Sequence, residues 1–199
     1  MHRYFILNKP RNMVSQFVSP HAVGLLGDLD FIFPPDTHAL GRLDKDSEGL
    51  LLLTTDKRAT RLLFSGDKLH RRTYLVMVQN EITTETFEQL ENGIAIKVKN
   101  AEHYIAKPAA IERIDDPLIF YPYAKDRREG WPHTWLLITL TEGKYRQVRK
   151  MVLTARHRCL RLIRLSISGI QLGNLQPGEV KELEEKDFYE LLGIQAPGE

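Results

Sequence analysis

The sequence has a single cysteine, short apolar runs and no visible leader peptide. Cys159 has no cysteine partner in the chain, which excludes an internal disulfide and a cysteine-rich zinc site. Apolar runs such as residues 50–53 are far shorter than the roughly 20 residues that span a bilayer. The N-terminus lacks a long apolar segment that ends in a small-residue cleavage site. We therefore expect a protein of the cytoplasm, without a structural metal and not of a membrane.

The composition is that of an ordinary globular protein. The chain has 199 residues, of which 42% are hydrophobic and 27% are charged. This length suits one domain or two small lobes with a real core. Disordered, collagen-like and coiled-coil proteins have different compositions and are excluded on that ground.

Positive charge is concentrated in one part of the chain, although the formal net charge is only +2. Residues 144–164 contain no acidic residue and eight basic ones, which are Lys144, Arg146, Arg149, Lys150, Arg156, Arg158, Arg161 and Arg164. A second basic group contains Lys68, Arg71 and Arg72. A solvated helix surface is one interpretation of this pattern. The absence of compensating acids favours the other interpretation, a face that contacts nucleic-acid phosphates.

The hydrophobic pattern predicts short strands and short helices in irregular order. The predicted strands are residues 3–8, 38–43, 50–54, 73–78, 135–140, 165–170 and 178–183. Helices are predicted after the cap residue Asp56, over residues 83–91, around the buried stripe of Val148, Met151, Val152 and Ala155, and before Gly193. Arg149 and Arg156 would share another face of the third helix. Residues 115–133 are predicted to be a long loop, and the mixture favours an α+β fold over a doubly wound sheet.

Residues 41–54 (Gly-Arg-Leu-Asp-Lys-Asp-Ser-Glu-Gly-Leu-Leu-Leu-Leu-Thr) are the most informative stretch. Three carboxylates, Asp44, Asp46 and Glu48, precede an apolar strand. A plain surface loop explains the Asp, Ser and Gly residues. An acid held beside a buried strand is also suited to act as a nucleophile or base. A third interpretation is a glycosidase, which uses two acids around a sugar.

This stretch resembles the signature of RNA pseudouridine synthases, specifically the RsuA-like branch that modifies ribosomal RNA. Residues 72–76 (Arg-Thr-Tyr-Leu-Val) and 142–151 (Glu-Gly-Lys-Tyr-Arg-Gln-Val-Arg-Lys-Met) agree in order, as do residues 7–10 and 160–164. The resemblance covers the whole chain. Residues 132–135 point to the large-subunit synthase E type within the branch. Tyr145 differs from the family, which usually has Asn there.

The resemblance implies a role for three residues. Asp44 corresponds to the catalytic aspartate, which acts on uridine so that the N-glycosidic bond is cut and uracil rejoins through carbon. Arg149 corresponds to the arginine that pairs with this aspartate and keeps it ionised. Tyr74 corresponds to the tyrosine that lies against the target base, although a strand tyrosine in the core is the alternative.

Substrate binding is predicted at further basic residues. A uridine in folded RNA must be flipped out of its stack, and Arg42, two residues before Asp44, is expected to fill or brace the vacated space. Phosphate contacts are predicted for Arg72, Lys144, Arg146 and Lys150. Asp46 and Glu48 are interpreted as loop-shaping residues rather than further catalytic acids.

The sequence therefore predicts a cofactor-free and metal-free enzyme that isomerises a specific uridine of ribosomal RNA, with large-subunit RNA favoured. The alternatives are a catalytically idle RNA-binding relative and the glycosidase. The resemblance implies a mixed, mainly antiparallel sheet with flanking helices in two lobes and a central catalytic cleft. Residues 1–199 would form this single catalytic domain, without an N-terminal RNA-binding domain, and we expect a monomer.

Overall fold

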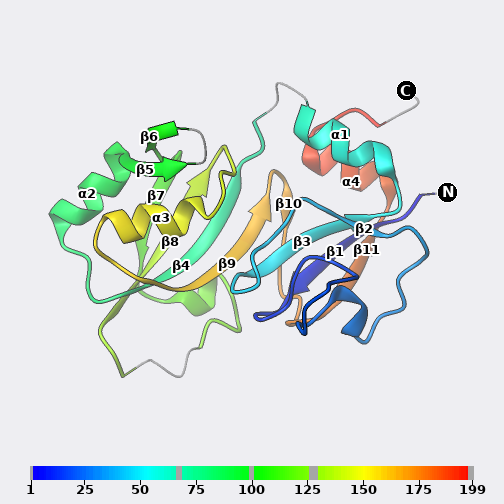
Figure 1. The fold of residues 1–199 in the computed structure, drawn as a ribbon, viewed down its shortest axis with the longest axis horizontal. Coiled ribbons are helices and arrows are strands. Elements are labelled where there is room, and N and C mark those ends of the chain that lie inside the picture. The colour runs from blue at the N-terminus through cyan, green and yellow to red at the C-terminus, as the bar shows by residue number, and fades with distance from the viewer. Residues whose placement is uncertain (1, 66–68, 99–100, 126–129, 197–199) are drawn as a thin grey trace. The chain divides into compact units, whose positions relative to one another are not determined.

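The structure is a computed structural model that describes residues 2–65, 69–98, 101–125 and 130–196. The chain divides into two compact units (Figure 1). Unit 1 contains residues 1–70 and 164–199, and unit 2 contains residues 71–163. Unit 2 is therefore one continuous segment, whereas unit 1 is assembled from both ends of the chain.

Unit 1 is built on neighbouring strands in the order β11-β1-β3-β9. These are β1 (Tyr4–Lys9), β3 (Glu48–Thr54), β11 (Val180–Leu183) and β9 (Cys159–Ile167), which begins in unit 2. Strand β2 (His38–Leu40) pairs with β3, and β10 (Ile170–Gln171) pairs with β9. β1 is antiparallel to β3 and β11, and all residues of β1 and β3 are buried. Burial on both faces explains why β3 is apolar without alternation.

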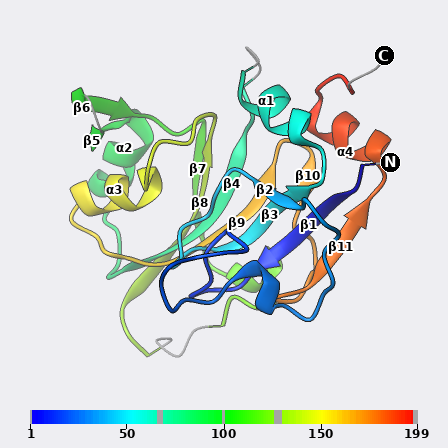
Figure 2. The ribbon, with the colours of Figure 1, turned by 45° about the vertical axis from the view of Figure 1, so that its right-hand side comes forward.

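Successive residues of β1 face different cores of unit 1, because side chains alternate along a strand. Phe5 and Leu7 join an apolar cluster with Met13, Leu26 of the 3-10 helix η1 (Leu26–Asp28), Leu43, Leu51 and Leu53. Tyr4 instead packs on Phe188 of helix α4 (Glu185–Leu192), with the ring centroids 4.7 Å apart. Helix α1 (Lys57–Ser65) lies beside α4 (Figures 1 and 2). The two helices therefore cover the Tyr4 face.

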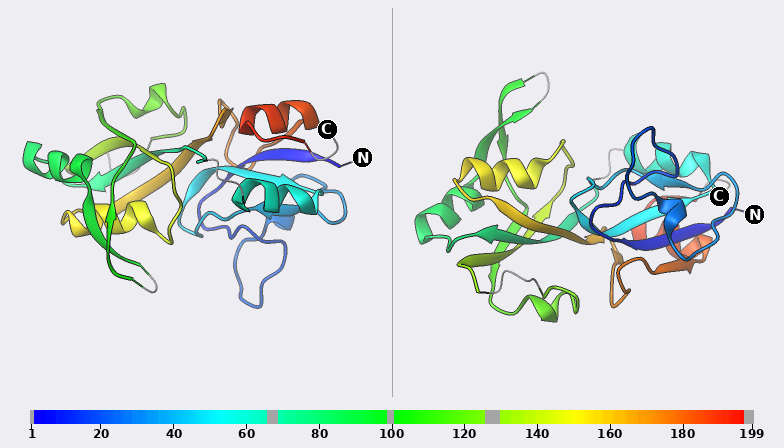
Figure 3. Two further views of the ribbon diagram at one scale, coloured as in Figure 1. Left: turned by 90° about the horizontal axis from the view of Figure 1, so that it is seen from above. Right: turned by 60° about the horizontal axis from the view of Figure 1, so that its bottom comes forward.

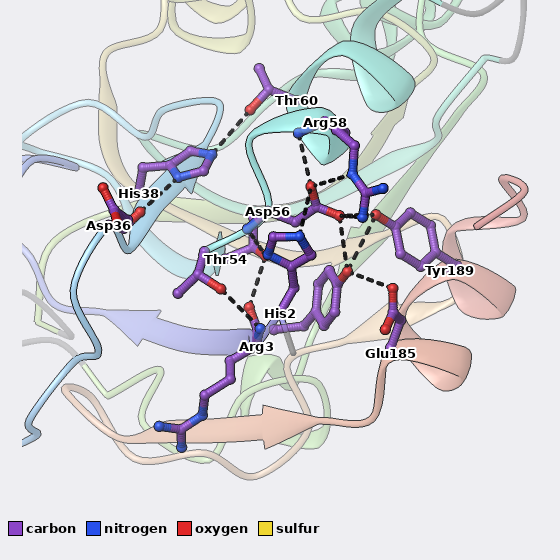
Figure 4. A network of polar contacts seen from close by, with 12 residues as sticks. His2, Arg3, Asp36, His38, Thr54, Asp56, Arg58, Thr60, Glu185 and Tyr189 are labelled. Atoms are coloured by element: carbon purple, nitrogen blue, oxygen red, sulfur yellow. Dashed lines mark hydrogen bonds and ion pairs between the residues drawn. The ribbon is translucent and has the colours of Figure 1, made fainter. Parts of the chain in front are cut away.

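A buried carboxylate links α1, α4 and β1 (Figure 4). Asp56, which is 1% exposed, precedes α1 and accepts hydrogen bonds at Oδ1 from the Arg58 backbone N–H (3.0 Å) and Nε (2.9 Å). Its Oδ2 lies 3.1 Å from the hydroxyls of both Tyr4 and Tyr189, and Tyr4 is also 3.0 Å from Glu185 Oε1. Burial by itself raises the pKa of Asp56, but the bonds from Arg58 and the tyrosines outweigh it and hold the pKa well below its usual range.

Unit 2 is built on strands in the order β9-β4-β8-β7. Strands β4 (Arg72–Gln79) and β7 (Ala110–Ile114) are both antiparallel to β8 (His133–Leu140). A hairpin pairs β5 (Ile94–Val98) with β6 (Ala101–Ala106). Helix α2 (Thr84–Asn92) contacts β7, and helix α3 (Gln147–Thr154) contacts β5 (Figure 3). One cluster of buried side chains from these strands and helices forms the core of the unit.

The predicted α+β fold with a mainly antiparallel sheet is confirmed. The predicted helices overlap α1 to α4, and the predicted strands overlap observed ones, except that residues 165–170 contain the turn between β9 and β10 and that β9 begins earlier, at Cys159. Two predicted helix-end residues act as expected, since Asp56 caps α1 and Gly193 ends α4 with a φ of +62°. At the start of α2, the Thr83 side chain accepts a hydrogen bond from the Thr86 N–H. The cleft between lobes stays a prediction.

The predicted helical face shared by Arg149 and Arg156 is wrong, because α3 ends at Thr154 and Arg156 follows it with a φ of +64°. Arg149 itself is buried. The strands β5, β6 and β7 were not predicted from the pattern.

The predicted long loop is confirmed where the structure describes it. Between β7 and β8, the described residues contain one turn of 3-10 helix, η2 (Pro117–Ile119). Arg127 and Arg128 of this loop, and Lys68 of the second basic group, lie outside the described residues. Within the described part of the chain, none of the helices is long and apolar enough to cross a bilayer.

Candidate functional site

Asp44 lies in unit 1, in the connection from β2 to β3. A positive φ of 76° at Gly41 turns the chain after β2. Leu43 is buried, whereas its neighbours Arg42 and Asp44 are exposed and half-buried. This alternation agrees with the extended geometry in which Arg42 and Asp44 point to the same side. The Ser47 N–H then donates to the Asp44 carbonyl at 3.0 Å, and the turn leads into β3.

The segment after β1 holds the main chain on both sides of Asp44. The buried hydroxyl of Ser15 accepts from the Leu43 N–H at 3.0 Å and donates to the Leu43 carbonyl at 2.9 Å. The Asn12 N–H donates to the Lys45 carbonyl at 2.8 Å. Residues 43 and 45 are thus fixed by the same short segment. Sequence reasoning missed Ser15 and Asn12, because a lone serine or asparagine in a loop gives no signal.

A buried ammonium group lies near this connection. Lys9 is fully buried, and its Nζ donates to the carbonyls of Pro10 (2.8 Å) and Met13 (2.7 Å). Burial lowers the pKa of Lys9 to about 8, although three nearby carboxylates favour its charged form. These carboxylates belong to Glu48, Asp44 and Asp46. The acids of the loop therefore share one electrostatic environment with Lys9.

Tyr74 and Arg149 lie in unit 2. Tyr74, on β4, is 9% exposed and belongs to the same apolar cluster as Val148 and Val152 of α3. The strand that carries Tyr74 and the helix that carries Arg149 therefore pack on one core. Asp44 belongs to the other unit, so the pairing of Asp44 with Arg149 and the contact of Tyr74 with a base stay predictions.

Glu142 organises the turn that precedes α3. Its Oε1 accepts from Gln147 Nε2 at 2.6 Å, and its Oε2 accepts from the Tyr104 hydroxyl and lies 3.8 Å from Lys144 Nζ. The hydrogen bond to Glu142 raises the pKa of Tyr104 to about 12. Arg146, at the N-terminus of α3, has a left-handed φ of 53°. Polar contacts therefore fix the segment of residues 142–147 against strand β6.

Most of the predicted substrate-binding residues lie in this part of unit 2. Lys144, Arg146 and Lys150 are partly exposed. The guanidinium of Arg72 is adjacent, because a Cβ placed on Gly143 would lie 3.8 Å from Arg72 Cζ. Arg42 alone among them belongs to unit 1, where it is exposed.

Part of the predicted basic face is buried instead. Arg161 Nη1 donates to the carbonyls of Ala124 (2.8 Å) and Lys125 (3.2 Å), and Arg164 Nε donates to the Leu50 carbonyl (2.8 Å). Both side chains are less than 9% exposed. Contrary to the prediction, Arg161 and Arg164 do not belong to an exposed phosphate-binding face.

A ligand pocket and a metal site were also sought. A pocket of about 190 Å³ in unit 2 is lined by Met77, Asp115, Asp116, Pro117, Leu118, Ala124, Lys125, His133 and Trp135, so it contains none of the predicted site residues. In the part of the chain that the structure describes, no three His, Cys, Asp or Glu side chains are grouped to hold a metal ion.

Several known proteins are similar to this chain in sequence, and a solved structure is similar in fold. The model of the RNA pseudouridylate synthase family matches residues 3–154. Ribosomal large subunit pseudouridine synthase E of Vibrio vulnificus (strain CMCP6) is 38% identical over 182 residues, which cover 91% of this chain and 75% of that protein. Ribosomal small subunit pseudouridine synthase A of Escherichia coli (strain K12) is 32% identical over 187 residues, 94% of this chain and 72% of that protein. A crystal structure of a pseudouridylate synthase matches with a TM-score of 0.75 and 26% identity, and covers 96% of this chain and 74% of that one.

Proposed function

Because the chain belongs to the RNA pseudouridylate synthase family, we propose that it converts one uridine of large-subunit ribosomal RNA to pseudouridine. The family match carries this proposal, because residues 3–154 include Asp44, Tyr74 and Arg149. The relatives named for the large subunit support the choice of RNA. One of them is 38% identical to this chain, compared with 32% for a small-subunit synthase.

The reaction is an isomerisation that Asp44 drives. The bond from N1 of uracil to C1′ of ribose breaks and a bond from C5 to C1′ forms, while a proton leaves C5 and N1 gains one. An ionised carboxylate attacks or stabilises the cationic sugar that develops as the first bond breaks. The hydrogen bonds of Leu43 to Ser15 and of Lys45 to Asn12 support this role, because a reacting group must be held in one geometry.

Arg149, Tyr74 and Arg42 act on the flipped nucleotide. The guanidinium of Arg149 keeps the Asp44 carboxylate ionised, and its fork suits a carboxylate better than an ammonium group does. Tyr74 stacks on uracil and takes part in proton transfer. Arg42, exposed two residues before Asp44, braces the space that the nucleotide leaves in the RNA.

Basic residues of unit 2 bind the RNA backbone. The exposure of Lys144, Arg146 and Lys150 around the start of α3, with Arg72 beside Gly143, supports phosphate contacts there. Such contacts position RNA without reading its sequence, so we expect affinity to fall steeply with salt concentration.

The function is tested by mapping pseudouridine in ribosomal RNA from cells that lack this protein. Wild type, Asp44→Asn and Asp46→Asn are supplied in parallel. We expect wild type to restore one lost site in large-subunit RNA. Asp44→Asn should lower the rate by at least about 10³-fold, since it removes the reacting carboxylate. Asp46→Asn makes the same chemical change in the same loop and should restore the site.

Two results would contradict the proposal. Identical maps in all strains would indicate an RNA-binding relative without this activity. Restoration by Asp44→Asn would show that another group carries the reaction. A restored site in small-subunit RNA would keep the activity and correct the substrate.

A further inference from the structure

We propose that Tyr145 is a stacking platform for an unpaired base of the RNA, with Lys144 and Lys150 as the cations that hold the adjoining phosphates. The proposal rests on the proposed function, since that function makes RNA the ligand. It adds a base-binding residue to a segment in which only phosphate contacts were expected.

Tyr145 is unusually accessible for an aromatic side chain beside a helix that is largely buried. Its side chain is 73% exposed, whereas residues 147–149 immediately after it are buried. Single exposed aromatic residues are common and by themselves indicate nothing. Tyr145 differs from such residues because the ammonium group of Lys150 is held close to its ring. Lys150 Nζ lies 5.4 Å from the ring centroid and donates a 2.7 Å hydrogen bond to the Lys97 carbonyl of β5.

A second tyrosine and cation lie in the same part of unit 2. Lys144 Nζ is 4.3 Å from the ring centroid of Tyr104 on β6. Glu142, the acid at this position, accepts hydrogen bonds from Tyr104 and Gln147 and lies near Lys144. The β5–β6 hairpin lies beside α3 (Figure 3). Tyr104 belongs to this hairpin, Lys150 to the helix, and Lys144 and Tyr145 to the turn that precedes the helix.

The alternation of ring and cation fits single-stranded RNA. Bases stack on aromatic side chains whatever their sequence, and lysines beside those side chains neutralise the backbone phosphates. Paired bases offer no free face for such stacking. The ligand is therefore an unpaired stretch of the RNA substrate rather than a duplex.

The test separates stacking from charge with two probes. One probe is a short single-stranded oligouridine, and the other is an oligomer of the same length whose riboses carry no bases. Their affinities are measured by fluorescence anisotropy at several salt concentrations for the full chain. The variants are Tyr145→Leu, Lys150→Gln and Leu153→Ala, the last a 66% exposed residue of the same helix that serves as control.

Tyr145→Leu should bind oligouridine about tenfold more weakly and bind the abasic oligomer as wild type does, with the same salt dependence. Lys150→Gln should weaken both probes and reduce the slope of log affinity against log salt by about 0.7, the value for one phosphate contact on a single strand. Leu153→Ala should change neither affinity.

A second readout reports the stacking itself. In Tyr145→Trp, oligouridine should quench tryptophan fluorescence beyond the change seen with wild type, whose Trp131 and Trp135 supply the background. The proposal is overturned if Tyr145→Leu binds oligouridine normally, if it weakens both probes equally, or if no added quenching occurs. A protein partner for Tyr145 would give the first of these results.

These outcomes are independent of the catalytic test. If wild type forms no pseudouridine in ribosomal RNA, the proposed function fails while the binding measurements still decide the platform. If pseudouridine forms normally but the probes show no base-dependent loss, the platform alone is rejected.

Discussion

The main chain around Asp44 depends on the side chain of a residue far away in the sequence. The Ser15 hydroxyl satisfies both polar backbone groups of Leu43, within a buried environment. Such a hydroxyl can accept one hydrogen bond and donate another, so one small side chain fixes the two peptide units that flank Leu43, the second of which leads into Asp44. If Asp44 reacts as we propose, Ser15 is a positioning residue for its carboxylate.

Removal of this hydroxyl should affect the reaction more than the binding of RNA. In Ser15→Ala, the buried N–H and carbonyl of Leu43 lose these bonds, which should lower the free energy of unfolding by about 1–3 kcal/mol. The freed main chain would let Asp44 move, so kcat should fall by up to about 10²-fold with little change in KM. Steady-state kinetics and urea unfolding measure the two effects.

Ser19→Ala is the matched control for this change. Ser19 lies in the same connection and its hydroxyl accepts from the His21 N–H at 3.1 Å, away from Leu43. Its kcat should equal that of wild type. A stability loss in Ser15→Ala with an unchanged kcat would show that Ser15 supports the fold alone.

At the scale of elements, helix α1 depends on the residue that precedes it. Asp56 caps the helix and accepts from Tyr4 of β1 and Tyr189 of α4, so one carboxylate serves three elements. In Asp56→Asn, the free energy of unfolding at neutral pH should fall by about 2 kcal/mol, because the bonds from Arg58 and the two tyrosines lose their charged acceptor.

This loss should depend on pH in a defined direction. The folded pKa of Asp56 is depressed, so its stabilising contribution is complete above the unfolded pKa of about 4 and is lost progressively at lower pH. The difference between wild type and Asp56→Asn in urea unfolding should therefore shrink from pH 6 to pH 2.5. Asp36→Asn is the control, since the Asp36 side chain is 70% exposed and lies 3.7 Å from the exposed Lys57 ammonium group. A constant difference would contradict the assigned cause.

The elements that the sequence predicted correctly have strong local signals. Residues 50–53 are an uninterrupted apolar run, and Asp56, Thr83 and Gly193 mark helix ends through their own chemistry. Strand β5 was overlooked although Ile94, Ile96 and Val98 alternate along it, whereas β6 and β7 were missed because their signal is weak. In β7 only Ile111 is buried, and β6 contains a histidine, a glutamate and three alanine or tyrosine positions in no regular alternation.

A pattern of charged residues does not show which of their side chains are buried, as Arg161 and Arg164 demonstrate. The guanidinium group of Arg161 donates a hydrogen bond to the Ala124 carbonyl, and that of Arg164 donates one to the Leu50 carbonyl. Both carbonyls are distant in the sequence from the arginine that they bind. A buried charge is tolerated when such bonds compensate for lost water. These contacts arise from the tertiary fold, so the sequence indicated the charge of the segment correctly and the exposure of two of its arginines wrongly. The role of Asp44 stays a prediction, and it could be made from the sequence because the motif that carries it is contiguous.

At the scale of the whole molecule, the buried Lys9 makes stability depend on alkaline pH. Its folded pKa is about 8 against an ordinary value of 10.5, so the unfolded chain binds more protons between these values. The free energy of unfolding should therefore rise with pH across this interval, by about 3 kcal/mol for this group.

The comparison of wild type with Lys9→Met isolates this contribution. The variant has no amine to titrate, so its urea unfolding should lack the rise, whatever its stability at neutral pH. Lys45→Met removes an exposed lysine and should keep the wild-type profile. Parallel profiles for wild type and Lys9→Met would refute the effect of burial on Lys9.

The two segments of unit 1 emerge from the ribosome at different times, because residues 71–163 are translated between them. Strands β1 and β3 and the Asp44 connection leave the ribosome early, followed by all of unit 2 as one continuous segment. Strand β11 and helix α4, which cover β1, are translated after unit 2. A nascent chain can therefore complete unit 2 while β1 is paired with β3 but still lacks β11 and α4. Until these two elements emerge, the uncovered edge and face of β1 need shielding from other chains.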